Sequence, residues 1–296
     1  MNQFKGTGVA LVTPFNADKS IDFLALERIV EHSVQGGVDY LVVLGTTAEA
    51  ATLSKAEKQQ VAQKVALTNA GRVPLVLGIG GNNTSTVVEE LQHTDLSEYD
   101  AVLSVSPCYN KPTQEGIYHH FKALSEASPK PIIMYNVPSR TGSNMAPMTT
   151  VRLARDFENI IAIKEACGNS IQIDTILSTK PDGFQVISGD DFTALSTVLA
   201  GGSGVISVLG QGLPHEFSEM IRLGLENNAR QAYQIHHQLL PLMHLGFEEG
   251  NPAGIKSIFE SLGLSTASVR LPLVEASNPL KKKIGDFLGT LSRVGA

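Results

Sequence analysis

The sequence has no tryptophan and only two cysteines among its 296 residues. Neither Cys108 nor Cys167 belongs to a C-x-x-C pair, so the usual zinc and dithiol signatures are missing. A chain of this size needs no disulfide framework, and we expect a reducing compartment. No apolar run reaches the roughly 18–20 residues of a membrane span, and residues 1–5 lack the pattern of a signal peptide. We therefore expect a cytoplasmic protein with no membrane partner.

Positive charge is in the minority, since 23 lysines and arginines stand against 29 acidic residues and give a formal net charge of −6. This balance argues against nucleic acid as a partner. An anionic substrate would have to be held by local positive groups. Hydrophobic residues make up 42% of the chain, which is enough for the core of one large domain or two ordinary ones.

Several motifs of known chemistry are also missing. The sequence contains neither H-E-x-x-H nor a G-x-S-x-G elbow. The adjacent histidine pairs at 119–120 and 236–237 would diverge on a helix instead of sharing a metal. In the segment from Gly78 to Asn83, an asparagine stands where a dinucleotide fingerprint needs its third glycine. We predict no catalytic metal and no organic cofactor.

Short apolar runs rich in β-branched residues recur along the chain, with helix-like segments between them. They predict eight strands, at residues 8–12, 39–44, 75–79, 101–105, 132–135, 160–164, 184–187 and 204–208. Their starts are 20 to 36 residues apart, which leaves room for one crossover helix each. This alternation predicts an α/β fold with a parallel sheet, and eight strands favour a closed (β/α)8 TIM barrel. An open doubly wound sheet is the alternative.

Capping signals mark several of the expected helices. Asp22 can cap one helix, and Ser54 and Glu57 have the spacing of a capping box at the start of another. Pro147 and Pro214 suit first helical turns. These signals support the alternation of strands and helices.

After residue 228 the pattern becomes purely helical. It predicts a C-terminal appendage of three helices, at residues 229–245, 253–262 and 279–291. We therefore divide the chain into a catalytic barrel domain, residues 1–227, and a C-terminal helical region, residues 228–296.

The strand at 160–165 ends in a lysine. Side chains alternate along a strand, which predicts Ile160 and Ala162 on the face that carries Lys164. Burial lowers the pKa of lysine, by up to roughly 3–5 units, from about 10.4. At a pKa of about 7–8 the neutral amine becomes a usable nucleophile that forms a Schiff base with a ketone. The alternative is a lysine whose amine reaches out to water.

Polar side chains follow other strands, and in a barrel they would face one cavity. Thr46 and Thr47, after Gly45, offer hydroxyls and backbone N–H groups to a small carboxylate. Tyr135 can point inward beside Lys164 and pass protons. Arg140 can grip a second carboxylate. Each has a plain alternative, such as a local turn or a side chain in water, but their convergence at one end of a barrel favours a shared site.

These residues resemble a known family. Gly45-Thr46-Thr47-x-Glu49, Tyr109-Asn110, Tyr135-Asn136-x-Pro138-x-Arg140-Thr141-Gly142 and Lys164-Glu165 are similar to motifs of the dihydrodipicolinate synthase family. This family belongs to the pyruvate-dependent class I lyases, which include N-acetylneuraminate lyase. The resemblance extends over essentially the whole chain, and the motif set is specific although each piece alone is not.

The resemblance implies a lyase of lysine and diaminopimelate biosynthesis that forms 4-hydroxy-tetrahydrodipicolinate. Lys164 would form an imine with pyruvate, whose enamine attacks L-aspartate 4-semialdehyde. Thr46 and Thr47 would hold the pyruvate carboxylate. Gly189 and Ile206 would line the pocket, and Arg140 would bind the carboxylate of the second substrate. Protons would be relayed by three hydroxyl groups, those of Tyr135, Thr46 and Tyr109. The resemblance also implies a homotetramer, a dimer of dimers in which Tyr109 reaches a neighbouring subunit's site.

Two departures from the family pattern stand out. Ala48 replaces the second glycine of the G-x-x-G-E motif, so the turn must tolerate a Cβ or be altered. The second departure lies at the positions that match the lysine-inhibition site of some relatives: Ala50, Lys55, Lys58, Asn82, Thr86 and Cys108. The carboxylate of that site is missing at Thr86 and its tyrosine at Cys108, and the two lysines add positive charge. We predict weak or absent inhibition by lysine, and half-inhibition by sub-millimolar lysine would contradict this.

Two other functions compete with this one. A sibling aldolase acting on a sialic acid or a keto-deoxy sugar acid would share Lys164 and Tyr135. The sialate lyases, however, lack an arginine matching Arg140 and have Ser-Thr in place of Thr46-Thr47. A non-catalytic pyruvate-binding barrel should have lost Lys164 or Tyr135, and both are present.

Overall fold

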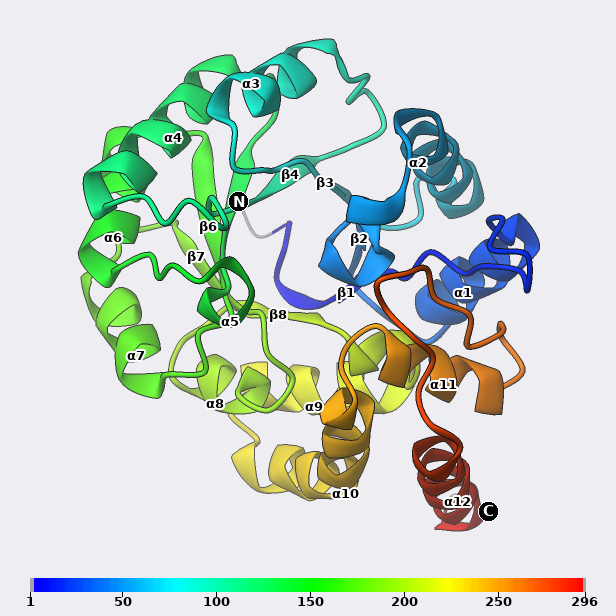
Figure 1. Cartoon of the computed structure of the whole chain (residues 1–296). Coiled ribbons are helices and arrows are strands. Elements are labelled where there is room, and N and C mark those ends of the chain that lie inside the picture. Colours follow the sequence, from blue (N-terminus) through cyan, green and yellow to red (C-terminus); the bar gives the residue numbers. More distant parts are fainter. Residues whose placement is uncertain (1–2, 295–296) are drawn as a thin grey trace.

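Eight parallel strands close into a barrel, in sequence order around the ring (Figure 1). The computed structural model describes residues 3–294, with side chains described up to residue 291. The strands are β1 (Gly6–Ala10), β2 (Tyr40–Val43), β3 (Leu75–Gly78), β4 (Ala101–Val105), β5 (Ile132–Asn136), β6 (Ile160–Glu165), β7 (Gln185–Ser188) and β8 (Gly204–Ser207). The predicted (β/α)8 barrel is confirmed, and the open sheet is excluded because β1 pairs with β8.

The helices that follow the strands form the outer ring of the barrel, except for the short α5, which lies inside that ring (Figure 1). They are α1 (Phe23–Gln35), α2 (Lys55–Asn69), α3 (Thr84–His93), α4 (Gln114–Ala127), α5 (Pro138–Thr141), α6 (Pro147–Asp156), α7 (Ser170–Thr179), α8 (Ala194–Leu199) and α9 (Pro214–Leu225). The predicted starts are confirmed: Asp22 accepts a hydrogen bond from the Ala25 N–H, and Ser54 and Glu57 form a capping box. Short 3-10 turns follow β2 and β8, as η1 (Thr46–Ala48), η2 (Ala50–Thr52) and η3 (Leu209–Gln211).

The barrel interior is filled by a core to which all eight strands contribute alternate residues. Ala162 and Tyr135 belong to this inner core. The prediction for Ile160 was wrong, because it packs in the outer core with Ile163, while Ile161 packs against the inner one. The register between β5 and β6 shifts at this point, and such a bulge reverses the facing of the residues before it. Lys164 lies beyond the shift and keeps the alternation with Ala162.

The C-terminal region forms the predicted helices, α10 (Ala229–Glu248), α11 (Ala253–Ser261) and α12 (Asn278–Val294). Helix α10 packs on α9 and on α11, and α11 packs on α12. The region therefore continues the outer layer of the barrel (Figure 1). A domain boundary at residues 227 and 228 stays a prediction. Within residues 3–294, every helix falls short of the length or apolar character required to cross a membrane.

Candidate active site

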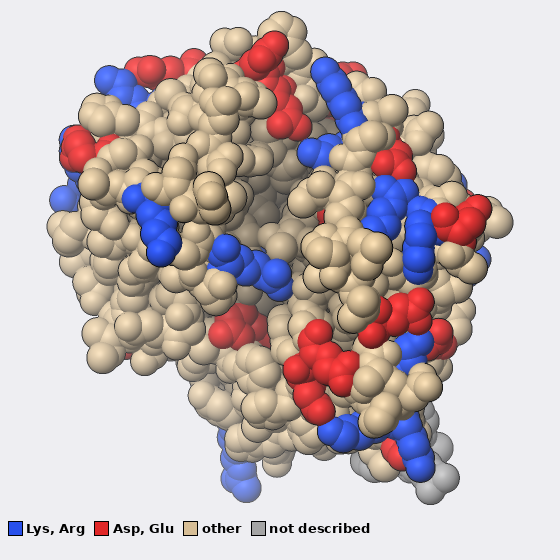
Figure 2. Space-filling view, viewed as in Figure 1, with Lys and Arg blue, Asp and Glu red and all other residues tan. Residues whose placement is uncertain are grey.

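A cavity of about 270 Å³ opens at the C-terminal ends of the strands. Five polar residues predicted for the site line this cavity: Thr46, Thr47, Tyr135, Arg140 and Lys164. Gly189, which was also predicted, lines it as well. Figure 2 shows the molecule hollowed at the centre of the ring, with lysine and arginine side chains beside the opening. The sequence therefore brings these side chains together from β2, β5, β6 and β7 and the loops that follow them.

Lys164 lies near the end of β6 and is 5% exposed. Burial lowers its pKa to about 8, although the Asp191 carboxylate acts to raise it and the Arg140 guanidinium acts to lower it. The register of the sheet pairs Lys164 with Tyr135 on β5, and the lysine Nζ lies 4.5 Å from the centre of the tyrosine ring. An appreciable fraction of this amine is therefore neutral near neutral pH, as nucleophilic attack requires.

Tyr135 is buried near the end of β5 and lines the same cavity. Burial raises its pKa, while the positive charge of Arg140 and a side-chain hydrogen bond with Thr46 act to lower it. The phenol is therefore protonated at neutral pH. A protonated phenol in contact with a hydroxyl can pass a proton along a chain.

The turn after β2 presents Thr46 and Thr47 to the cavity from the 3-10 turn η1. The Thr47 hydroxyl is buried and accepts a hydrogen bond of 2.9 Å from the Asn251 amide nitrogen. Ala48 is buried within η1, and the left-handed backbone falls on Glu49, at φ 54°, not on Ala48. The alanine is therefore compatible with the turn, because no positive φ is needed where the family has glycine.

Arg140 lies on the short helix α5, at the exposed rim of the cavity. Its guanidinium donates a hydrogen bond of 3.3 Å to the Asn251 carbonyl oxygen. Asn136, the last residue of β5, anchors the loop that follows α5. Its side chain donates a hydrogen bond of 2.9 Å to the buried Glu165 carboxylate and accepts one of 3.0 Å from the Met145 N–H. The guanidinium has five N–H donors, so it can meet an anion at the mouth while it keeps the bond to Asn251.

Three other predicted residues have distinct positions. Gly189 lines the cavity, and a Cβ there would lie 2.7 Å from the Ala166 Cβ and 3.0 Å from the Lys164 Cε. Ile206 is fully buried in the inner core and is not among the residues that line the cavity in the described part of the chain. Tyr109 is 88% exposed, has a positive φ of 69°, and lies outside the lining of this chain's own cavity.

Two lining residues were missed because they come from the C-terminal region. Phe247 lies in the last turn of α10, and Asn251 lies in the connection from α10 to α11. The Asn251 Oδ1 is buried with no hydrogen-bond partner among the described residues. The site was predicted from residues that follow strands. The C-terminal region is purely helical, so this reasoning could not show that it lines one side of the cavity.

The described residues contain no group of three or more histidine, cysteine, aspartate and glutamate side chains that could hold a metal ion. The cavity lining carries one amine, one guanidinium, a phenol and hydroxyls, with the Asp190 carboxylate, the Asn251 amide and the apolar side chains of Phe192 and Phe247. Such a set can hold a carboxylate and carry out carbonyl chemistry through the amine.

Comparison with known sequences agrees with this site. Residues 3–290 match the sequence model of the Dihydrodipicolinate synthetase family. The chain belongs to this family. A 4-hydroxy-tetrahydrodipicolinate synthase of Flavobacterium psychrophilum is 58% identical over 99% of this chain and 100% of its own length. One of Parabacteroides distasonis is 50% identical over 97% of each chain.

Solved structures of the Dihydrodipicolinate synthetase family have the same fold. The crystal structure of dihydrodipicolinate synthase from Aquifex aeolicus superposes with a TM-score of 0.94 and 38% identity, and the match covers 98% of both chains. The family resemblance expected from the motifs at β2, β5 and β6 is therefore confirmed over the whole described chain.

Proposed function

We propose that this enzyme is a lyase that condenses pyruvate with L-aspartate 4-semialdehyde to give 4-hydroxy-tetrahydrodipicolinate, a step toward diaminopimelate and lysine. The observation that carries the proposal is the buried Lys164 amine, with its pKa lowered to about 8, in a cavity that offers separate groups for two carboxylates. The names of the relatives support the same reaction. They do not favour the sibling aldolases of sialic acids and keto-deoxy sugar acids.

The first step is imine formation. The neutral Lys164 Nζ attacks the ketone carbon of pyruvate. The carbonyl oxygen takes one proton from the attacking nitrogen and a second from an acid, and leaves as water. We assign that acid to Tyr135, which is protonated and whose ring lies beside the lysine. The hydroxyls of Thr46 and Thr47, with the N–H groups of their turn, bind the pyruvate carboxylate.

The second step forms the new carbon–carbon bond. The imine loses a proton from its methyl group and becomes an enamine, whose carbon attacks the aldehyde of the second substrate. Arg140 at the rim binds that substrate's carboxylate. The aldehyde oxygen takes a proton through Tyr135 and Thr46. The substrate's own amine then attacks the imine carbon, which closes the ring and frees the Lys164 amine.

Assembly completes the relay. The Tyr109 phenol is 88% exposed on the single chain, which fits a side chain that reaches another subunit. The partner subunit's Tyr109 would join Tyr135 and Thr46, so that an active site needs a dimer. A homotetramer made of two such dimers is the assembly that we expect.

No organic cofactor is part of this mechanism, since the electron sink is the imine on Lys164 itself. The weak or absent inhibition by lysine stays a prediction. Lys55, Lys58 and Thr86 line a separate cleft between α2 and α3, together with four acidic residues: Glu89, Glu90, Asp95 and Glu98.

The decisive assay incubates the enzyme with pyruvate and L-aspartate 4-semialdehyde and follows both substrates and the cyclic product by mass spectrometry. We expect equimolar consumption of the two. Parallel incubations contain pyruvate with N-acetylmannosamine, or a sialic acid alone. Turnover of those sugars without consumption of the semialdehyde would contradict the proposal.

A further inference from the structure

The turn that presents Thr46 and Thr47 has an unusual backbone. Leu44 and Glu49, which flank it, have positive φ angles of 59° and 54°. Residues other than glycine are strained in this region and remain there only when their surroundings hold them. The contacts of Glu49 therefore decide where the turn lies.

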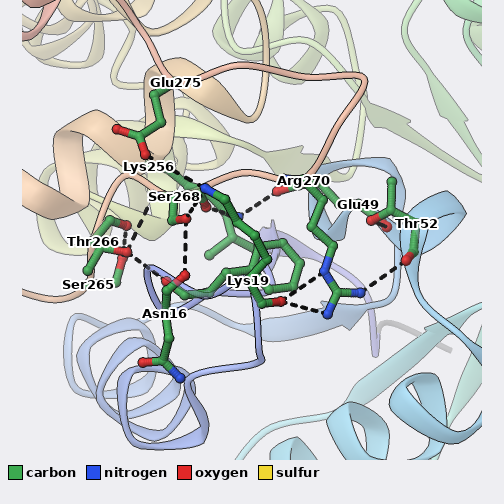
Figure 3. A network of polar contacts seen from close by, with 12 residues as sticks. Asn16, Lys19, Glu49, Thr52, Lys256, Ser265, Thr266, Ser268, Arg270 and Glu275 are labelled. Atoms are coloured by element: carbon green, nitrogen blue, oxygen red, sulfur yellow. Dashed lines mark hydrogen bonds and ion pairs between the residues drawn. The ribbon is translucent and has the colours of Figure 1, made fainter.

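The Glu49 side chain is held by a buried polar network (Figure 3). Its Oε1 accepts a hydrogen bond of 2.5 Å from the Lys256 Nζ, and its Oε2 accepts one of 2.8 Å from the Arg270 backbone N–H. The side chains of Lys256 and Glu49 are 0% and 1% exposed. Both lie outside the set of residues that line the catalytic cavity in the described chain.

Lys256 is itself fixed from three sides. Its ammonium donates to the Ser268 carbonyl oxygen at 2.8 Å and lies 4.2 Å from the centre of the Phe15 ring. Within the described residues, Glu49 is the only carboxylate that forms an ion pair with it. A buried ammonium needs such a partner, so the turn and the start of α11 are joined by charge as well as by packing.

The same segment of the C-terminal region contacts the turn a second time. Asn251, at the connection between α10 and α11, donates to the Thr47 hydroxyl at 2.9 Å. Asn251 thus orients the hydroxyl of Thr47, and Lys256 holds Glu49 at the end of the same turn. The two contacts place the carboxylate-binding turn relative to the C-terminal helices.

We propose that Lys256 and Glu49 are a positioning pair for the proposed reaction, which sets the affinity for pyruvate by holding the Thr46–Thr47 turn in register with Lys164. The inference rests on the proposed function. Neither side chain touches the substrate. The C-terminal helical region is then part of the catalytic apparatus, because it supplies the ammonium that fixes the turn.

A purely structural pair would behave differently. Its loss would lower the free energy of unfolding and the amount of folded enzyme, but the folded fraction would bind pyruvate as before. A positioning pair changes the pyruvate concentration needed for half-maximal imine formation. Misplacement of a binding group by about 1 Å can change such a quantity by roughly tenfold to hundredfold.

The test measures that concentration by borohydride trapping. Lys256→Met/Glu49→Gln removes both charges together, so that neither is left buried without its partner. Wild type and variant are titrated with pyruvate, reduced, and the adduct on Lys164 is quantified by mass spectrometry. Lys283→Met is the matched control, because Lys283 pairs with Glu248 at 2.7 Å on the exposed surface of the same region. Circular dichroism establishes that each variant is folded.

We expect the double variant to need roughly tenfold more pyruvate, or beyond, while Lys283→Met matches the wild type. An unchanged half-saturating concentration in a folded double variant would overturn the positioning role. If the double variant does not fold, Lys256→Arg, which keeps the buried charge paired but changes the geometry of its contact with Glu49, is titrated under the same criterion. Failure of the wild type to form any adduct on Lys164 would instead refute the proposed function, so the two failures are distinguishable.

Discussion

The Lys164 Nζ lies 4.5 Å from the centre of the Tyr135 ring, and their strands pair these two residues directly. The contact puts a phenol, a weak acid, beside the amine that we propose attacks the ketone of pyruvate. It arises from the register of β5 against β6, after the shift that follows Ile132. The geometry of one strand pair therefore positions both the proposed nucleophile and its proposed proton donor.

The first prediction concerns pH. Because the pKa of Lys164 is lowered to about 8, kcat/KM for pyruvate should rise with pH below about 8 and level off above it. An unperturbed lysine would keep the rate rising to about 10.4. Lys256 is a second buried lysine whose pKa burial lowers. The same inflection in Lys256→Met/Glu49→Gln would assign it to Lys164, and its loss there would contradict the assignment.

Tyr135→Phe should keep the ring beside Lys164 but remove the proton donor. We expect kcat to fall by roughly a hundredfold or more, with the adduct on Lys164 still detectable after long incubation. Tyr40→Phe is the matched control, since the Tyr40 hydroxyl donates to the Val205 carbonyl oxygen in the same inner core. The control should lose about 1 kcal/mol of stability and keep its kcat. Equal kcat values for the two variants would rule out the relay.

Gly189→Ala should disable imine formation. The added Cβ would lie 2.7 Å from the Ala166 Cβ and 3.0 Å from both Cε and Cγ of Lys164, so we expect the lysine side chain to be displaced. We expect at least a roughly tenfold slower formation of the adduct, because misplacement of a reacting group by about 1 Å can cost more than that. Gly289→Ala on α12, where a Cβ meets nothing within 4 Å, is the control and should react normally. A normal rate in Gly189→Ala would show that the lysine has room to adapt.

The Arg140 guanidinium is expected to act on the second substrate only. Arg140→Ala should still form the pyruvate adduct on Lys164, while condensation with the semialdehyde falls by roughly a hundredfold, as expected for loss of a charged anchor. Arg152→Ala, which removes an exposed arginine of α6, should leave both steps intact. If condensation survives unchanged in Arg140→Ala, this arginine has no role in substrate binding.

The side chains at the ends of the strands could be predicted from the sequence, because the length of each strand and the alternation of its side chains show which residues reach the C-terminal end of the barrel. Lys164, Tyr135, Thr46 and Arg140 meet in one cavity for this reason. The bulge in β6 was not predictable, since an apolar run such as residues 160–163 fits either face.

The contributions of the C-terminal region could not be predicted either. Asn251 and Lys256 act on the turn after β2 across more than 200 residues of chain, at separations of 204 and 207 residues. Helical periodicity says which face of a helix is buried, but not which loop of the barrel it meets. These contacts follow from tertiary packing alone.

The most direct test of the whole account is to locate the covalent adduct. The enzyme is incubated with pyruvate, reduced with borohydride and digested, and the modified peptide is sequenced by mass spectrometry. We predict one modified residue per chain, at Lys164, and none in Lys164→Ala. Modification of a different lysine, or an undiminished adduct in Lys164→Ala, would contradict the account.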